Sequence, residues 1–264
     1  MGEHLCETAS IGAGVSQKIY LLFLYIILSV KRWSGKLPSF KKHKKIKIQW
    51  EGKIATFYIK HQIDLDILRE TFVDNQYEID NALQPKVIVD LGSNIGATVL
   101  KFHLQYPGAI IYAFEPDPNN FEWLKLNTAA FSDKVILDER PISGISGKKV
   151  KFYTGSQYHW SSSLLNREGK TDNFVQRTTL SIDDMIKEYK LDKIDMLKCD
   201  IEGAEEDAFK HCTKWDNINY IIGELHPKLI TLSADDFFSL FPNFTLLALD
   251  TKSWVFKLKN QNLP

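Results

Sequence analysis

The chain has 264 residues, of which 44% are hydrophobic and 25% are charged, and it carries 33 basic and 33 acidic side chains. This length can bury one sizeable core, and the balanced charge argues against a nucleic-acid-binding protein. The three cysteines, Cys6, Cys199 and Cys212, are odd in number and lack metal-ligand spacing. They argue against a zinc site or a disulfide framework and favour a reducing, cytoplasmic compartment.

The N-terminal segment joins an apolar run to a basic stretch. Residues 19–30 are almost entirely apolar, and most residues from Lys31 to Lys47 that carry charge are lysines. The run is too short for a membrane span, which needs about 20 residues, and its flanks do not fit a cleaved signal. Two alternatives stay open. The run is either a helix packed on the domain, followed by a basic linker, or a monotopic anchor in which residues 19–47 contact the inner face of a membrane.

We therefore divide the chain into residues 1–45, the apolar helix and basic linker, and residues 46–264, the main domain. The main domain opens with alternating apolar and polar residues at 46–60 that break at Glu51-Gly52, which is typical of a β-hairpin. Residues 64–77 carry apolar side chains at helical spacing, with Asp64 as the expected N-cap.

Beyond Pro85 the sequence predicts strands and helices in regular alternation. Strands are expected at residues 86–90, 109–114, 134–138, 194–199 and 219–224. Helices are expected at residues 96–105, 118–130, 181–189 and 203–212. This alternation predicts βαβ units in an α/β fold with a doubly wound, mostly parallel sheet, and the tail from Phe244 predicts a closing antiparallel hairpin that turns at Asp250-Thr251. Ligands of such sheets bind beyond the carboxyl ends of the strands, so we expect the functional residues there.

The stretch VIVDLGSNIGATVLKF, residues 87–102, leaves a strand through Asp90 and a glycine turn. It lacks the GxGxxG pattern with which NAD-binding proteins approach a pyrophosphate. An acid at this point suits a ligand with a cationic, amino-acid-bearing end, such as S-adenosylmethionine. The bland alternative for Asp90 is a helix N-cap.

Glu115 ends the second expected strand, 19 residues after Gly96. An acid at this position accepts hydrogen bonds from a ribose diol, which NAD and S-adenosylmethionine both carry. Glu115 therefore predicts nucleoside binding without choosing between these two cofactors. The alternative is a surface carboxylate.

Several segments occur in the order and spacing of one known family. They are DLGSNIGATVLKF, FEPDPNNFEWLKLN, SIDDMI, KCDIEGAEEDAF and ELHP. Over roughly residues 75–230 the chain resembles the FkbM-type methyltransferases, which are Rossmann-like class I enzymes that use S-adenosylmethionine. The resemblance implies a cofactor half at about 80–145 and an acceptor half at about 146–264.

The same resemblance implies a cofactor site. Its residues are Asp90, Gly92, Asn94, Gly96 and Glu115, with Ser93, Pro116, Ile142 and Asp200 beside them. Two stretches depart from the family pattern. Ser181-Ile182 stand where Thr-Leu is more usual, and the Arg140–Ser143 stretch replaces an Ala-hydrophobic-Ser sequence near the adenine.

The segment DIEGAEE brings several carboxylates to the same rim. Gly203 permits a tight turn there, and the candidate catalytic residues are Asp200, Glu202, Glu205 and His226. Glu202 and Glu205 have a spacing that can share a helical face, and carboxylates this close require a cation or a proton. One of Glu202, Glu205 and His226 could act as general base for an acceptor hydroxyl.

A divalent cation is the less favoured alternative. By analogy with catechol-type methyltransferases, Asp200 with Glu224 or His226 would hold it. A polar, aromatic-rich loop that includes Tyr158, His159 and Trp160 could cover the acceptor, although a lone histidine in a loop is more often simply exposed.

These features predict an S-adenosylmethionine-dependent methyltransferase that acts on a small-molecule or glycan acceptor. The expected reaction is O-methylation of a hydroxyl on a sugar, a polyketide or a lipid-linked glycan. Two alternatives stay open: an NAD-dependent oxidoreductase, and a non-catalytic, membrane-peripheral module that binds a nucleoside.

Overall fold

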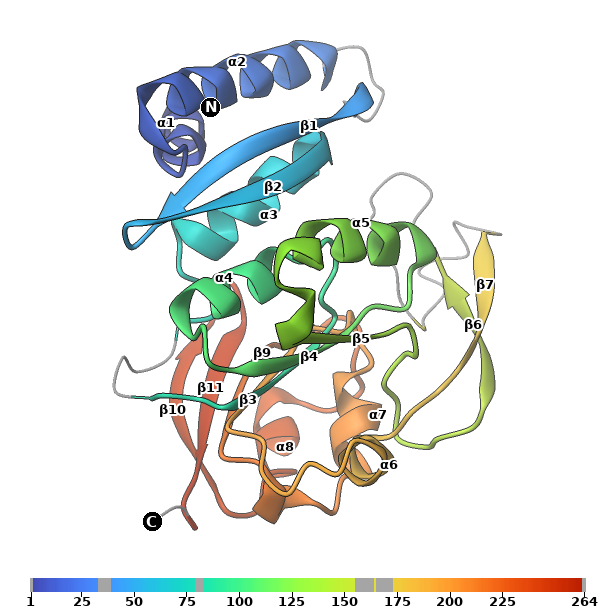
Figure 1. Cartoon of the computed structure of the whole chain (residues 1–264). Coiled ribbons are helices and arrows are strands. Elements are labelled where there is room, and N and C mark those ends of the chain that lie inside the picture. Colours follow the sequence, from blue (N-terminus) through green and yellow to red (C-terminus); the bar gives the residue numbers. More distant parts are fainter. Residues whose placement is uncertain (1, 33–38, 79–82, 155–163, 165–172, 263–264) are drawn as a thin grey trace.

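The computed structural model of the chain describes residues 2–32, 39–78, 83–154, 164 and 173–262 (Figure 1). The N-terminal elements form a unit that is stacked on a larger α/β domain. The unit consists of α1 (Gly2–Ser10), α2 (Gly14–Arg32), β1 (Ser39–Trp50), β2 (Lys53–His61) and α3 (Gln62–Phe72). The expected hairpin at 46–60 is therefore present, but its first strand begins earlier than predicted.

The basic stretch from Lys41 to Lys47 lies in strand β1 and is not a linker. It forms a strand because Ile46 and Ile48 alternate with its lysines, are fully buried, and pair with β2. The boundary that we placed at residue 45 falls inside this strand, and the two-part division of the chain stays a prediction.

Helix α2 is packed on the domain through one face, as the first of the two alternatives for residues 19–30 predicts, and contact of residues 19–47 with a membrane stays a prediction. Its inward face is buried in the same hydrophobic core as the hairpin and the larger sheet, through Leu21, Leu24, Tyr25 and Leu28. Among the described residues, no helix has both the length and the apolar character that a membrane span requires.

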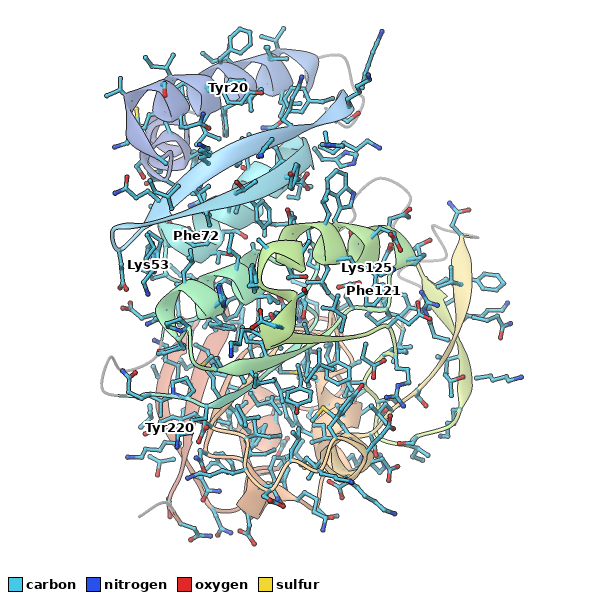
Figure 2. The ribbon with its side chains drawn as sticks, in the orientation of Figure 1. Tyr20, Lys53, Phe72, Phe121, Lys125 and Tyr220 are labelled. Atoms are coloured by element: carbon cyan, nitrogen blue, oxygen red, sulfur yellow. The ribbon has the colours of Figure 1, made fainter. Side chains whose placement is uncertain are left out.

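Helix α3 begins at Gln62 and ends at Phe72, so it is shorter than the expected helix at 64–77. Asp64 is its third residue and not its N-cap, and its carboxylate accepts hydrogen bonds from the backbone N–H groups of Lys60 and His61. The unit contacts the larger domain through Lys53, which donates to the carbonyl oxygen of Leu104, and Phe72 is buried at the same junction (Figure 2).

The larger domain is built on a seven-stranded sheet. Its strands are β3 (Val87–Leu91), β4 (Ile110–Phe114), β5 (Val135–Asp138), β8 (Met196–Cys199), β9 (Tyr220–Glu224), β10 (Phe244–Asp250) and β11 (Val255–Asn260). They lie in the order β10-β11-β9-β8-β3-β4-β5, and the five from β9 to β5 are parallel. The mostly parallel sheet and the closing antiparallel hairpin are thus confirmed.

Helices cover both faces of this sheet. Those of the larger domain are α4 (Ala97–Gln105), α5 (Pro118–Thr128), α6 (Ile182–Glu188), α7 (Glu205–Lys210) and α8 (Ala234–Phe238), with short 3-10 helices at Ala129–Lys134 and Trp215–Asn217. Figure 1 shows α4 and α5 between the sheet and the N-terminal unit, whereas α6, α7 and α8 lie on the opposite face. A separate hairpin of β6 (Lys149–Tyr153) and β7 (Phe174–Thr178) stands to one side.

The chain order reverses between β3 and β8, because β4 and β5 follow β3 in one direction and β9 follows β8 in the other. This is the switch point at which open α/β sheets bind ligands. Gly92 lies there with a positive φ of 82°, and a Cβ atom at this position would overlap the backbone carbonyl of Asp200. The close approach of β3 and β8 therefore requires glycine at residue 92.

We expect Gly92→Ala to destabilise the protein by more than about 3 kcal/mol, because it combines an unfavourable φ with a backbone collision. Gly52→Ala is the matched control, because Gly52 has a φ of 78° and open space around its Cβ position. The control should lose only about 1 kcal/mol. Thermal unfolding followed by circular dichroism measures both changes, and equal losses would contradict the role assigned to the close approach.

Candidate functional site

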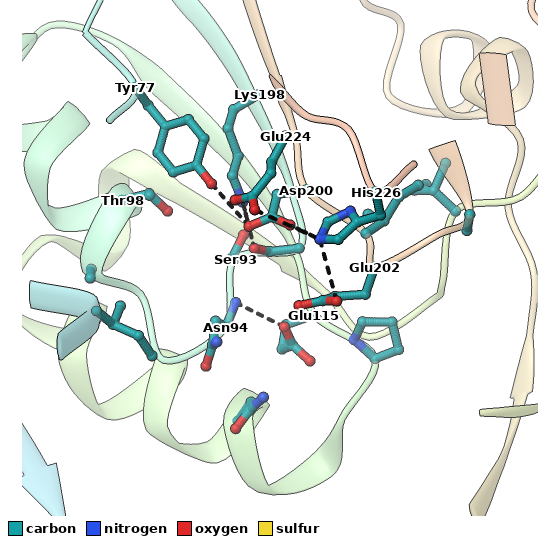
Figure 3. A pocket seen from close by; sticks show the side chains of 18 of the residues that line it. Tyr77, Ser93, Asn94, Thr98, Glu115, Lys198, Asp200, Glu202, Glu224 and His226 are labelled. Atoms are coloured by element: carbon teal, nitrogen blue, oxygen red, sulfur yellow. Dashed lines mark hydrogen bonds and ion pairs between the residues drawn. The ribbon is translucent and has the colours of Figure 1, made fainter. Parts of the chain in front are cut away.

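A cavity of about 440 Å³ opens at the switch point. The glycine turn after β3 lines one part of it, and the ends of β4, β8 and β9 supply most of its charged side chains (Figure 3). Helix α3 closes it from the N-terminal unit. In Figure 3, Asn94 and Glu115 mark one end, and the carboxylates of Asp200, Glu202 and Glu224 gather with His226 at the other.

Glu115 is held ready to accept hydrogen bonds. Its carboxylate accepts from the backbone N–H groups of Asn94 and Asp117, both at 2.8 Å, and the residue is buried at the end of β4. Burial raises the pKa of Glu115 to about 8, although these two N–H donors lower it. A ribose diol that donates two more hydrogen bonds would favour the ionised carboxylate, so the position suits a nucleoside.

The wall beside Glu115 is apolar. Pro116, Pro141 and Ile142 line the cavity there, as expected of a surface against which an adenine packs. Arg140, the unusual residue of this stretch, does not line the cavity, because its guanidinium pairs with Asp138 and Glu188. The departure from the family pattern therefore leaves the adenine wall apolar.

Asp90 lies beneath the cavity and does not line it. It is fully buried, with its carboxylate 3.1 Å from the ammonium of Lys198 and hydrogen-bonded to the hydroxyl of Thr98. The cation that Asp90 meets is therefore a lysine of the same protein, and its role toward a ligand is indirect. The same ammonium donates to the carbonyl oxygen of Gly92 at 2.7 Å and fixes the glycine turn.

Lys198 keeps its charge in this buried place. Burial alone would lower the pKa of its ammonium, but Asp90 and then Asp200 outweigh burial and raise the pKa. Sequence reasoning missed this residue. The signal was present, because a lysine inside the apolar run IDMLKCD must find a buried partner.

The other residues of the glycine turn have two roles, because one begins helix α4 and two line the cavity. Gly96 is the left-handed N-cap of α4, packs near Leu124, and does not line the cavity. Ser93 and Asn94 do line it, and Ser93 donates to the backbone carbonyl of Asp90. The buried Oδ1 atom of Asn94 has no hydrogen-bond partner among the described residues, which leaves an acceptor for the amino or hydroxyl groups of a bound cofactor.

The segment DIEGAE forms a tight turn before α7. Glu202 and Gly203 both have positive φ values, 57° and 98°, and Glu205 is the first residue of the helix. Glu202 precedes the helix, so the expectation that Glu202 and Glu205 share a helical face is wrong. Because the turn reverses the chain between them, Glu202 lines the cavity whereas Glu205 is fully buried behind it.

Glu205 orients His226. Its carboxylate accepts from the backbone N–H groups of Ile201 and Gly203, at 3.1 and 2.8 Å, and lies 2.9 Å from Nδ1 of His226. The other ring nitrogen, Nε2, is 3.4 Å from Glu202 and 3.9 Å from Asp200. A buried carboxylate on Nδ1 fixes the tautomer and leaves Nε2 directed at the carboxylates of the cavity.

The surroundings at the acid-rich end raise the pKa values of His226 and Glu224. Burial alone would lower the pKa of His226, but its hydrogen bond to Glu205 and the charges of Glu205, Asp200 and Glu202 raise it to about 9. Burial and the charge of Asp200 raise the pKa of Glu224 to about 7. Strongly shifted pKa values of this kind cluster at functional sites.

Residues before β3 complete this end, and no motif in the sequence indicated them. The hydroxyl of Tyr77 donates to Asp200 at 3.0 Å, and the amide of Gln76 donates to Glu224 at 2.9 Å. Both residues follow α3, in a segment that we had expected to be helical. Tyr158, His159 and Trp160, the loop proposed to cover the acceptor, lie outside the described residues.

Comparison with known proteins identifies the family. The sequence profile described as the Methyltransferase FkbM domain matches residues 90–244. The chain belongs to the FkbM methyltransferase family. The matched region runs from Asp90 to the first residue of β10, so it contains the glycine turn, Glu115 and the Glu205–His226 pair.

Individual relatives agree with this assignment. The chain is 26% identical over 196 residues to the 31-O-demethyl-FK506 methyltransferase FkbM of Streptomyces tacrolimicus, a match that covers 61% of this chain and 74% of the relative. It is 28% identical over 182 residues to the 2-O-methyltransferase NoeI of Sinorhizobium fredii, covering 61% and 73%. It is 27% identical over 158 residues to the hexuronic acid methyltransferase AglP of Haloferax volcanii, covering 58% and 63%.

This methyltransferase therefore uses S-adenosylmethionine on a Rossmann-like class I fold, as the sequence predicted. The two alternatives, an NAD-dependent oxidoreductase and a non-catalytic module, receive no support from the family or its members. The individual roles of the site residues stay predictions, and the geometry above indicates which of them touch the cavity.

We expect Lys198→Met to destabilise the protein by about 3–5 kcal/mol, because it leaves the buried Asp90 carboxylate without a cation. The double variant Lys198→Met with Asp90→Asn should recover most of this loss, since neither charge then remains. Urea unfolding of the wild type, both single variants and the double variant measures the coupling. Losses that simply add would contradict a direct pair.

Proposed function

We propose that this methyltransferase transfers the methyl group of S-adenosylmethionine to an uncharged hydroxyl, with His226 as the general base. The observation that carries the proposal is the pairing of Nδ1 of His226 with the buried Glu205 carboxylate, while Nε2 is directed at the cavity. Nδ1 of His226 therefore orients the imidazole ring, and Nε2 is available to react.

The charge of the cavity supports an uncharged acceptor. Asp200, Glu202 and Glu224 line its acid-rich end, and Glu70 of α3 lines it as well. Carboxylates accept hydrogen bonds from sugar or polyketide hydroxyls, whereas they repel a carboxylate or a phosphate. The names of two relatives, a 31-O-demethyl-FK506 methyltransferase and a 2-O-methyltransferase, agree with an oxygen acceptor, while the acidic lining disfavours an acceptor such as hexuronic acid.

The cofactor supplies a methyl group that is already activated by its sulfonium. The protein therefore mainly has to hold the acceptor oxygen in line and remove its proton. As the new C–O bond forms, the bond between the methyl carbon and the sulfonium sulfur breaks and a neutral thioether leaves. The hydroxyl proton passes to Nε2 of His226, and Glu205 stabilises the resulting imidazolium. Asp200 is kept in place for this step by its hydrogen bond from Tyr77.

The reaction that we propose does not require a metal ion. Ligand atoms of Asp200, Glu202 and His226 lie within 4.8 Å of one another, so these residues could surround a cation. However, Nδ1 of His226 pairs with Glu205, so Nε2 is the nitrogen left to react, and it cannot both bind a metal and accept the proton of the acceptor. In the proposed reaction the carboxylates of this end balance the charge of the protonated His226.

We expect kcat/KM for the acceptor to rise with pH toward a plateau above about 9, because only the neutral form of His226 accepts the proton. Glu205→Gln removes the carboxylate that raises the pKa of His226, so the midpoint of this rise should move to lower pH. His226→Ala should lose about a hundredfold or more in rate and should lose the rise itself.

Glu206→Gln is the control for this series, because Glu206 bonds to Thr231 and does not line the cavity. Its pH profile should match that of the wild type. The profiles are measured with and without a chelator. A profile that His226→Ala leaves unchanged, or activity that disappears with the chelator, would contradict the metal-free role of His226.

We expect Glu115→Gln to weaken S-adenosylmethionine binding by about tenfold to a hundredfold, because one carboxylate oxygen that accepts from the ribose is replaced by an amide donor. Glu122→Gln, an exposed acid of the neighbouring helix α5, should leave binding unchanged. Calorimetric titration of the wild type and both variants provides the measurement, with NAD as the competing ligand. Tight binding of NAD, or equal losses in the two variants, would contradict the assignment of Glu115.

A further inference from the structure

Helix α2 carries a second apolar face that points away from the core. Its members follow one another at intervals of four, four, three and four residues, which places them in one stripe along the helix. They are Val15, Ile19, Phe23, Ile26 and Val30, and each is between 50% and 74% exposed. This outer stripe is separate from the buried face and from the cavity, so the methyl-transfer site does not explain it.

The stretch of sequence that contains this stripe carries only positive charge. Residues 8–50 contain nine lysine and arginine residues and no aspartate or glutamate, although the whole chain has a formal net charge of zero. Figure 1 shows β1 beginning beside the C-terminal end of α2. Lys41, Lys42, Lys45 and Lys47 of β1 are all exposed, and none has an acidic partner among the described residues.

The first of these lysines surround a hollow. Lys41, Lys42 and Lys60 line it together with His43 and Trp123, and its volume is about 360 Å³. Two or three ammonium groups around one hollow attract phosphate groups, and tryptophan is enriched where proteins meet the headgroups of a bilayer. The basic start of β1 thus lies beside the end of the apolar stripe, and the hollow opens where the β1–β2 hairpin faces α5 (Figure 1).

We propose that the stripe and the β1 lysines dock this protein on an anionic lipid surface. The stripe enters the boundary between headgroups and acyl chains, and the lysines contact anionic headgroups. A second copy of the chain is a poorer occupant, because it would bring two uncompensated basic segments together. A nucleic acid would satisfy the lysines but would leave the apolar stripe in water. This docking is independent of the proposed acceptor and base.

Vesicle flotation of the full chain tests this docking. We expect association with vesicles of equimolar phosphatidylcholine and phosphatidylglycerol, little association with phosphatidylcholine alone, and weakening at high salt. The double variant Ile19→Ser with Phe23→Ser should lose about tenfold or more in affinity for the anionic vesicles. Lys41→Gln with Lys42→Gln should lose roughly twentyfold, at about fivefold for each lysine.

Matched variants elsewhere on the surface complete the test. Leu247→Ser, at an exposed leucine of β10, and the lysine pair Lys148→Gln with Lys149→Gln should keep full binding. Retained S-adenosylmethionine binding shows that every variant is folded. Absence of vesicle association at low salt, equal losses in the control variants, or a soluble dimer that the Ile19 and Phe23 changes dissociate would each overturn the proposal.

Discussion

The contact on which the site depends is the buried pair of Lys198 and Asp90. One ammonium neutralises Asp90 at the end of β3 and donates to the carbonyl oxygens of Leu91 and Gly92. It also lies 3.9 Å from Asp200 at the end of β8. Without it, two carboxylates and a turn with its carbonyls directed inward would meet in a space with little water. Gly92 makes the same approach possible sterically, because no side chain separates the two strands. The charge of Lys198 and the missing side chain of Gly92 therefore stabilise the same approach of β3 and β8.

The two ends of the cavity differ in their chemistry. The end at Glu115 offers backbone-held acceptors and an apolar wall, which suits a nucleoside whatever reaction follows. The end at His226 concentrates carboxylates around one imidazole, which suits a proton that must leave an acceptor. Lys198 lies on the strand that leads into Asp200 and bonds to the glycine turn, so the two ends share one rigid support.

Much of the fold was predictable because apolar periodicity and turn residues were strong. The parallel strands β3, β4, β5, β8 and β9 are short, mostly apolar runs with an acid at or beside their ends. The expected positions of Glu115 and His226 at the rim follow from those ends alone. Asp90 shows the limit of this reasoning, because a sequence does not reveal that a lysine of β8, the neighbouring strand in the sheet, will occupy the place of a ligand. Tyr77 and Gln76 show another limit. They reach the cavity through tertiary packing of α3, which local propensity does not encode.

Helix α3 has a consequence for how specificity can change. Ile63, Ile67 and Glu70 line the cavity, yet they lie before residue 90, where the match to the family begins. One wall of the cavity is thus encoded upstream of the segment that carries the proposed cofactor and base residues. Exchange of this short upstream stretch between related genes would change one wall of the cavity and leave the residues around Lys198 unaltered. Diversification of substrates can then proceed by recombination at one junction, without the loss of activity that accompanies changes around Lys198.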